Sequence, residues 1–359
     1  MMQSQDKHDG IASVWQDKQR NYKIDYIKGI LITLVVFGHS IQYGSGLTFF
    51  SEECYFDDTL FKIIYSFHMP CFGIISGFLY YNHVRVRTFG EKMHKVGKLL
   101  LPMLCFAIVN TSVSLFNGSI TASISSVIQK YIWVVLYNWW FIWSIIICYI
   151  FWAVLELLKL GRLVKLILAF STQILFVILP NRANSPLYGF IFFYFLIGYS
   201  LTGLLPLYKK WVGHYIKNTV VALWIICIFF YQRENYIYTS QLSVNNIYNS
   251  PLKQLEVNVF RWVTGIVGSF SFMKICNRYI KKFSPGILAL FSYMGKNTIY
   301  IYILQSFFCV GLLQIIKVEL VQIHYFANVM QTFFILILCC ILIYGFQKTK
   351  QVLQKKESV

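Results

Sequence analysis

The chain of 359 residues is 57% hydrophobic and 18% aromatic, and only 13% of its residues are charged. Uncharged runs at this frequency exclude an ordinary soluble domain and predict an integral membrane protein of packed helices. The formal net charge of +18 invites a nucleic-acid interpretation, which the distribution of the basic residues described below argues against. The nine cysteines form no Cys-x-x-Cys pair and no His/Cys cluster of zinc spacing, so neither a disulfide framework nor a metal site is expected.

Apolar segments of helical length follow one another along the chain and predict an all-α, polytopic transmembrane helix bundle of about ten spans. A polar tail, residues 1–24, precedes them, and a basic tail, residues 348–359, follows, so residues 25–347 are expected to form the functional domain. Two stretches are ambiguous: 120–138 reads as re-entrant or interfacial, and 283–295 is too short to span and should lie at the surface or dip into the membrane. The expected spans are residues 29–47, 61–81, 99–117, 139–158, 164–180, 187–205, 218–232, 257–274, 297–316 and 325–346.

The positions of the lysines and arginines predict the orientation of the bundle. With the N-terminus inside, 25 of the 32 lysines and arginines fall on inner segments and 7 on outer ones. This is the positive-inside pattern, so both termini are expected to be cytoplasmic. The longest polar loop, residues 233–256, then lies outside, where it could cover an extracytoplasmic substrate or serve as a plain connector.

The first span contains ionisable groups at an unusual depth. From Gly29 to Phe50 there is no Asp, Glu, Lys or Arg, yet His39 lies inside this run, 11 residues after Lys28. At about 1.5 Å and about 100° per residue, His39 is roughly 16 Å beyond Lys28 on the same helix face, which Asp25 shares. Such groups are costly in hydrocarbon and are functional candidates, although an anchoring lysine and a helix-packing histidine would also satisfy the pattern.

The second span carries another intramembrane histidine, His68. Because this span is expected to run antiparallel to the first, His68 lies at the same depth as His39. The two imidazoles could exchange protons near neutral pH or simply hydrogen-bond between helices. The following Ser76-Gly77 pair predicts close helix packing, or room for a narrow ligand chain.

The inner loop after the second span is strongly basic. Lys92, Lys95 and Lys98 recur every three residues and would form a stripe on a helix. A stripe beside a membrane entrance suits the phosphates of a nucleotide-like cofactor, although positive-inside bias or contact with anionic lipid explains it equally well. The candidate phosphate-binding residues are Arg85, Arg87, Lys92, Lys95 and Lys98.

Later spans contribute candidate substrate contacts. Trp139 and Trp140 open the fourth span at the outer interface, where they could form an aromatic belt or stack on sugar rings. Arg261 lies just inside the eighth span and could contact a substrate or pair with Glu256. Gln305, deep in the ninth span, needs a hydrogen-bond partner, and because an amide is not a base it should position a ligand or bond a neighbouring helix.

Together these motifs resemble the acyltransferase 3 family of membrane acyltransferases, and within it the fucose 4-O-acetylase-like and polysaccharide O-acetyltransferase branch. The resemblance covers residues 22–346, with two departures: many relatives have arginine at the position of Lys28 and histidine at that of Gln305. The five motifs, in family order, are Lys28-x10-His39, Phe67-His68-Met-Pro70 with Ser76-Gly77-Phe78, Trp140-Phe141, Phe193-Tyr-Phe-Leu-Ile-Gly198-Tyr199, and Lys296-Asn297-Thr298-Ile-Tyr-Ile-Tyr302.

The resemblance implies an O-acyltransferase that moves an acyl group, acetyl above all, from acyl-CoA at the cytoplasmic face to a hydroxyl of a cell-envelope glycan or glycolipid. It implies a bacterial inner membrane, His39 as the essential general base with Lys28 supporting it, and His68 orienting His39 or bonding the acceptor. Direct transfer and an acyl-histidine relay both stay open. The alternative is a proton-coupled transporter or flippase of a glycan or lipid precursor, which would more often carry several intramembrane carboxylates. The expected substrate contacts are Asp25, Trp139, Trp140, Arg261 and Gln305.

Overall fold

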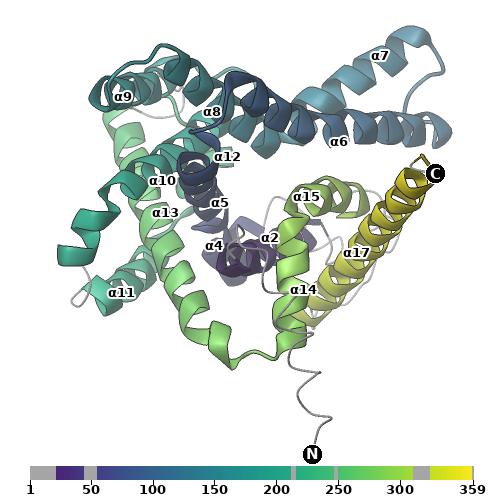
Figure 1. The fold of residues 1–359 in the computed structure, drawn as a ribbon. Helices are drawn as coiled ribbons and strands as arrows, with labels where there is room; N and C mark the ends of the chain where they lie inside the picture. The colour runs from purple at the N-terminus through teal and green to yellow at the C-terminus, as the bar shows by residue number, and fades with distance from the viewer. Residues whose placement is uncertain (1–21, 44–54, 212–215, 246–249, 310–323, 358–359) are drawn as a thin grey trace, which may run out of the picture.

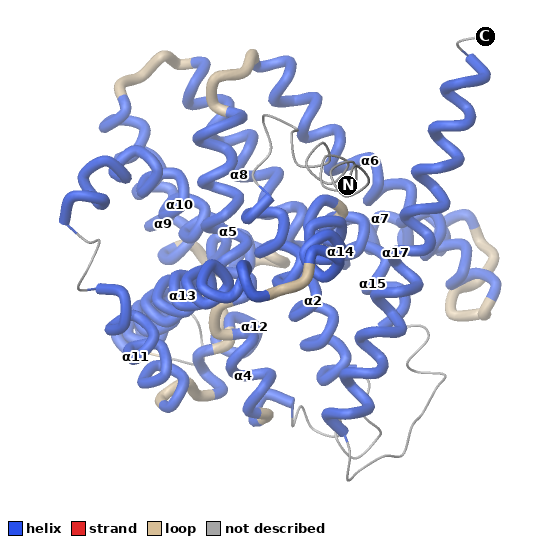
Figure 2. Tube along the Cα trace, turned by 60° about the horizontal axis from the view of Figure 1, so that its bottom comes forward, coloured by secondary structure: helices blue, strands red, loops and turns tan. Residues whose placement is uncertain are grey.

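The computed structural model describes residues 22–43, 55–211, 216–245, 250–309 and 324–357, and nearly all of them are helical (Figures 1 and 2). No β-strand occurs within these ranges, so the predicted all-α bundle is confirmed. The helices are α2 (Tyr22–Tyr43), α4 (Thr59–Tyr65), α5 (His68–Leu79), η2 (Tyr80–Val84), α6 (Phe89–Phe116), α7 (Ile124–Trp133), η3 (Val134–Asn138), α8 (Trp140–Leu157), α9 (Arg162–Ile178), α10 (Ser185–Trp211), α11 (Ile216–Phe229), η4 (Arg233–Asn235), α12 (Ile237–Ser240), α13 (Pro251–Tyr279), η5 (Ile280–Lys282), α14 (Pro285–Lys296), α15 (Thr298–Phe307) and α17 (His324–Glu357).

Seven helical stretches among the described residues are long and apolar enough to cross a membrane, and an eighth is obtained if the bent pair of α14 and α15 forms one span. The segments expected at 164–180 and 218–232 correspond to α9 and α11, which are 17 and 14 residues long and fall short of that length. The chain is therefore a multi-pass helical membrane protein, while the count of ten spans and the sidedness of the termini stay predictions.

The span expected at residues 61–81 is interrupted between α4 and α5. Pro70 cannot donate a backbone hydrogen bond to the Ser66 carbonyl, and its ring crowds that carbonyl, which breaks the helical ladder. Phe67 accordingly adopts φ −140°. Side chains from two other helices stabilise the break, because Trp224 Nε1 donates to Ser66 Oγ (3.2 Å) and Ser269 Oγ donates to the Phe67 carbonyl (3.4 Å). The break is thus built into the tertiary structure of the bundle.

The segment 283–295, expected to lie at the surface or to dip into the membrane, forms α14 and packs along the first helix, as the first half of a bent helix pair with α15. A Cβ added to Gly29 of α2 would lie 1.9 Å from the Phe291 carbonyl oxygen, and one added to Gly295 would lie 1.7 Å from the Asp25 carbonyl oxygen. Glycine therefore permits the two backbones to approach each other closely. The chain then bends by 78° between α14 and α15, and this bend brings α15 against the C-terminal half of α2.

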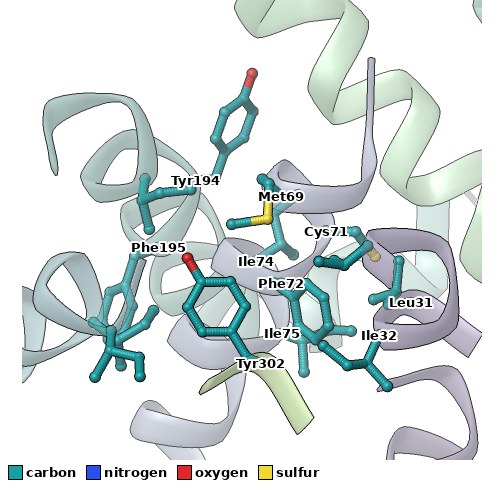
Figure 3. Packing of buried hydrophobic residues seen from close by; sticks show 14 of the residues in the cluster. Leu31, Ile32, Met69, Cys71, Phe72, Ile74, Ile75, Tyr194, Phe195 and Tyr302 are labelled. Carbon is teal, nitrogen blue, oxygen red and sulfur yellow. The ribbon is translucent and has the colours of Figure 1, made fainter. Parts of the chain in front are cut away.

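Helix α5 packs on α10 through a second pair of glycines. A Cβ on Gly77 would meet the Phe195 carbonyl oxygen at 2.1 Å, and one on Gly198 would meet the Ile74 carbonyl oxygen at 2.0 Å. The predicted packing role of Gly77 is therefore confirmed. Figure 3 shows the core at this junction, where side chains of α2 (Leu31 and Ile32), α5, α10 and Tyr302 of α15 converge.

Candidate functional site

The central feature of the site is a hydrogen bond between two residues 266 positions apart. His39 Nδ1 lies 2.8 Å from Gln305 Oε1, which joins α2 to α15. The Gln305 amide is oriented by its neighbours, since its Nε2 donates to the Tyr302 carbonyl (3.3 Å) and Cys309 Sγ donates to its Oε1 (3.4 Å). Gln305 is 1% exposed. It bonds a neighbouring helix, which is one of the two roles expected from the sequence.

This arrangement decides which nitrogen of His39 carries the proton. An amide oxygen only accepts hydrogen bonds, so Nδ1 of a neutral His39 must be the N–H donor to Gln305. The lone pair of the imidazole then lies on Nε2. A neutral histidine held in one tautomer by its other nitrogen is the arrangement that general-base catalysis requires.

His39 and Gln305 lie on the wall of a cavity of about 650 Å³. Its walls come from the ends of α2, α6, α8 and α15 that the positive-inside pattern places on the outer side, together with segments near residues 55–65 and 238. Among the described lining residues Lys130 is the one charged group, and amides and aromatic rings predominate. The lining includes Gln42, Tyr55, Tyr65, Asn110, Asn117, Lys130, Trp133, Tyr137, Asn138, Trp140, Tyr238, Tyr302 and Ser306.

A second, narrower cavity of about 150 Å³ extends along the inner half of α2. Lys28 lies at this cavity, and the rest of the described lining is almost wholly apolar, with side chains from α5, α6, α8 and α15. Ser76 is part of this wall, which fits the predicted room for a narrow chain. Tyr302 lines both cavities, so the Lys28 chamber and the His39 chamber meet at its ring.

His68 lies near this centre but has a different environment. Its Nδ1 donates to the Ile64 carbonyl (2.8 Å), which helps to bridge the break between α4 and α5. It is 3% exposed and packs against the Tyr65 ring (4.6 Å between centroids). Tyr65 lines the outer cavity, whereas His68 borders only a small adjoining void. His68 therefore supports the Tyr65 wall of the outer cavity, and its expected role in orienting His39 or bonding the acceptor stays a prediction.

The two tryptophans that open α8 have different roles. Trp139 is 2% exposed, and its Nε1 donates to Ser306 Oγ (3.2 Å), so its ring is not accessible for stacking on a sugar. Trp140 is half-buried and forms part of the outer cavity wall. Of the pair predicted to contact substrate, only Trp140 is positioned to do so.

Arg261 is a structural residue, which corrects both readings offered by the sequence. Its side chain is 2% exposed, and Glu256 pairs instead with Lys253 (3.8 Å). Its guanidinium donates to a set of protein acceptors that leaves no donor for a substrate. These are the carbonyls of Asn235 (2.8 Å), Gln241 (2.7 Å), Glu234 (3.3 Å) and Tyr236 (3.5 Å), Asn258 Oδ1 (3.1 Å) and Ser240 Oγ.

The loop that Arg261 organises, residues 233–241, forms one wall of the outer cavity through Tyr238. Tyr236 ties the same loop to the segment before α4, because its hydroxyl donates to the Phe56 carbonyl (3.0 Å). Burial raises the pKa of Tyr236 well above its ordinary value, with smaller contributions from Tyr231 and two nearby aspartates, so the phenol stays a neutral donor. The loop therefore contributes Tyr238 to the cavity wall, and its predicted role in covering an extracytoplasmic substrate stays a prediction.

The predicted basic stripe is interrupted at Lys92. This residue is 4% exposed and forms an ion pair with Glu156 of α8, whose Oε2 also accepts a hydrogen bond from Tyr80 (3.3 Å). Successive three-residue steps rotate around a helix, so Lys92 faces the core while Lys98 is exposed. The neutralised Lys92 is therefore a structural charge and not a free phosphate ligand.

The other basic candidates lie at the end of the bundle that the positive-inside pattern predicts to be inner. Arg85 is exposed and lies over the Tyr81 ring (4.3 Å), and Arg87 Nε donates to the His83 carbonyl (2.9 Å). Lys95 is half-buried, and Lys98 is exposed beside Leu99 of the inner cavity. These cations remain candidates for phosphate binding. Asp25, by contrast, is 4% exposed and lies away from the described cavities, against α14.

The acyltransferase domain profile of the acyltransferase 3 family matches residues 21–347. The chain belongs to this family. It is also similar to two proteins named nodulation protein NolL. One, from Mesorhizobium japonicum, is 26% identical over 300 residues, which cover 80% of this chain and 76% of that protein. The other, from Sinorhizobium fredii, is 24% identical over 235 residues, covering 63% and 62%. No solved structure matches.

The resemblance seen in the sequence is thus confirmed, and the protein is a multi-pass membrane acyltransferase. Within this acyltransferase, Gln305 makes the direct contact with His39.

Several residues that line the candidate site were not predicted from the sequence. Tyr302 belongs to the last of the five motifs, but no role was predicted for it. Its position three residues before Gln305, on the same helix face, was the available signal. Asn110 of α6 and Asn117, which directly follows that helix, line the outer cavity seven residues apart. Two asparagines at that spacing near the end of a predicted span were the available signal.

Proposed function

We propose that this acyltransferase moves an acyl group, acetyl in the simplest case, from acyl-CoA bound at the Lys28 end to a hydroxyl of a cell-envelope glycan or glycolipid in the outer cavity. The observation that carries the proposal is the His39–Gln305 hydrogen bond on the wall of a cavity rich in amides and aromatic rings. Amides match sugar hydroxyls, and aromatic faces such as Trp140 match sugar rings.

In the proposed reaction, His39 Nε2 takes the proton of the acceptor hydroxyl as the hydroxyl oxygen attacks the thioester carbonyl. The carbon–sulfur bond then breaks, the CoA thiolate leaves, and the proton on His39 passes to that thiolate. Gln305 keeps Nδ1 as the hydrogen-bond donor throughout, so the imidazolium formed in the reaction remains hydrogen-bonded. The apolar inner cavity would hold the pantetheine arm and exclude water from the thioester.

The donor side is proposed from charge and shape. Among the described residues that line the inner cavity, Lys28 is the one that carries a charge. The same end of the bundle also holds Arg85, Arg87, Lys95 and Lys98. Cations of this density suit the phosphates of CoA. Their number also supports a cytoplasmic location for this end of the bundle. We propose that the membrane is the inner membrane of a bacterium.

The test of the mechanism is acetyl transfer by purified protein in lipid vesicles, with CoA release measured by mass spectrometry. His39→Ala should lose about 10² to 10⁴ in rate, the usual worth of a general base, while inserting normally. The matched control is His94→Ala, because His94 is exposed on α6 and lies outside both cavities. Near-normal transfer by His39→Ala would refute the mechanism, and absence of any CoA release by the wild type would favour the transporter alternative.

Two further variants test Lys28 and the orientation. Lys28→Arg should keep activity, since the charge is retained, and Lys28→Ala should lose it; equal behaviour would make Lys28 a membrane anchor only. Single cysteines introduced at residues 90 and 352 should resist an impermeant thiol reagent added outside intact cells. Labelling of either from outside would reverse the proposed sidedness.

A further inference from the structure

Tyr302 is the one residue that lines both the inner and the outer cavity among the described residues. It is 7% exposed, and its ring lies edge-on to Phe141 of the inner cavity, with 5.9 Å between centroids. Figure 3 shows the ring directed in among the side chains of α5, beside Phe72 and Ile75. Tyr302 therefore lies at the boundary between the two cavities.

Tyr302 is also linked to the catalytic pair. Its carbonyl accepts the hydrogen bond from Gln305 Nε2, and Gln305 Oε1 accepts the one from His39. The backbone of Tyr302 therefore sets the position of the residue that orients the imidazole, while its ring forms the partition. A change confined to the ring leaves the carbonyl in place, so the two roles can be separated by mutation.

The two chambers that meet at this ring differ in chemistry. The outer cavity contains His39, several amides and Lys130, and admits water readily, whereas the inner cavity is lined almost wholly by aliphatic and aromatic side chains. A thioester in the inner cavity is protected from hydrolysis only while water from the outer cavity cannot pass the ring. Without that barrier, His39 would activate a water molecule as readily as an acceptor hydroxyl.

We propose that the Tyr302 side chain, packed against Phe141, is the partition that makes this enzyme select an acceptor hydroxyl over water. This inference rests on the proposed function for its chemistry, although the partition itself is a property of the fold. In wild-type protein the ring keeps the water of the outer cavity out of the inner one, while the acceptor hydroxyl, held beside His39, attacks the thioester at the point where the two cavities meet. Acceptor transfer then predominates over hydrolysis, in which water in place of the acceptor attacks the thioester and yields the free acid and CoA.

The first experiment compares acceptor-independent acetyl-CoA hydrolysis with acetyl transfer in vesicles. Tyr302→Ala should raise the ratio of hydrolysis to transfer by about tenfold or more. An effect of this size is typical when one side chain in a binding pocket is removed. Tyr302→Phe keeps the ring and should remain close to wild type. Tyr300→Ala is the matched control, because Tyr300 lies on the same helix and lines neither cavity. An unchanged ratio in a folded Tyr302→Ala protein would overturn the proposal.

A second experiment needs no substrate. Ser76 lies in the wall of the inner cavity, so Ser76→Cys reports access to that chamber. An impermeant thiol reagent applied from the outer side should modify this cysteine, detected as a labelled peptide, at least about tenfold faster in the Tyr302→Ala background than beside the native ring. Equal rates in both backgrounds would refute the partition. Faster labelling without any acetyl transfer by the wild type would confirm the partition and reject the proposed function.

Discussion

Replacing Gln305 by leucine tests whether the hydrogen bond to His39 sets the catalytic tautomer. Leucine has nearly the volume of glutamine, so the buried position stays filled while the acceptor for His39 Nδ1 (2.8 Å) disappears. The Tyr302 carbonyl also loses the hydrogen bond that Gln305 Nε2 donates (3.3 Å). The proton of the imidazole can then move to Nε2. An Nε2 that carries a proton cannot accept the proton of the acceptor hydroxyl.

The size of the loss follows from the hydrogen bonds removed. A buried hydrogen bond is worth about 1 kcal/mol net, and a stranded buried donor costs about 1 to 3 kcal/mol. Gln305→Leu should therefore lower kcat/KM by roughly 5-fold to 150-fold, at about 1.4 kcal/mol per tenfold. Gln305→His should stay within a few-fold of wild type, because an imidazole nitrogen can accept the same hydrogen bond. His39→Ala should be clearly worse than Gln305→Leu.

The assay is acetyl transfer by purified protein at equal amounts of folded enzyme. Gln173→Leu provides a matched control, since Gln173 is 4% exposed on α9 and neither atom of its amide has a hydrogen-bond partner among the described residues. That variant should keep full activity and be at least as stable as wild type, because an apolar side chain replaces an unsatisfied polar one. The reasoning fails if Gln305→Leu is as active as Gln173→Leu, or if it matches the loss in His39→Ala.

Three further predictions concern stability, measured by thermal unfolding in detergent micelles. Arg261→Lys should destabilise the protein by about 2 kcal/mol or more, because one ammonium cannot replace the guanidinium donors and buried carbonyls are stranded; a wild-type melting temperature would contradict this. Lys92→Met and Glu156→Gln should each cost about 3 to 5 kcal/mol, and the double variant should cost less than their sum, whereas additive losses would argue against a coupled pair. Gly29→Ala should lower stability by about 1 to 3 kcal/mol as α2 and α14 separate, while Gly97→Ala, with no atom within 4 Å of the added Cβ, should be neutral; equal effects would refute the close packing.

The sequence by itself determined the class of the protein and the position of its first catalytic candidate. Uncharged runs of about 20 residues are sufficient to predict membrane helices, because unpaired backbone groups are intolerable in hydrocarbon. Helical periodicity within one segment placed Lys28 and His39 on one face of α2, and the structure has them lining the two chambers along that helix. Local geometry of this kind depends only on residues near each other in the chain.

The tertiary structure alone decided which distant groups meet. Gln305 contacts His39 because α14 packs on α2 through glycines and the chain then bends by 78°, and no local pattern encodes that bend. The fates of Arg261 and Lys92 likewise depended on partners supplied by other segments. A charged side chain at a span end looks the same in a sequence whether it faces solvent, a ligand or a buried partner, and only packing settles which of these satisfies its charge and its hydrogen bonds.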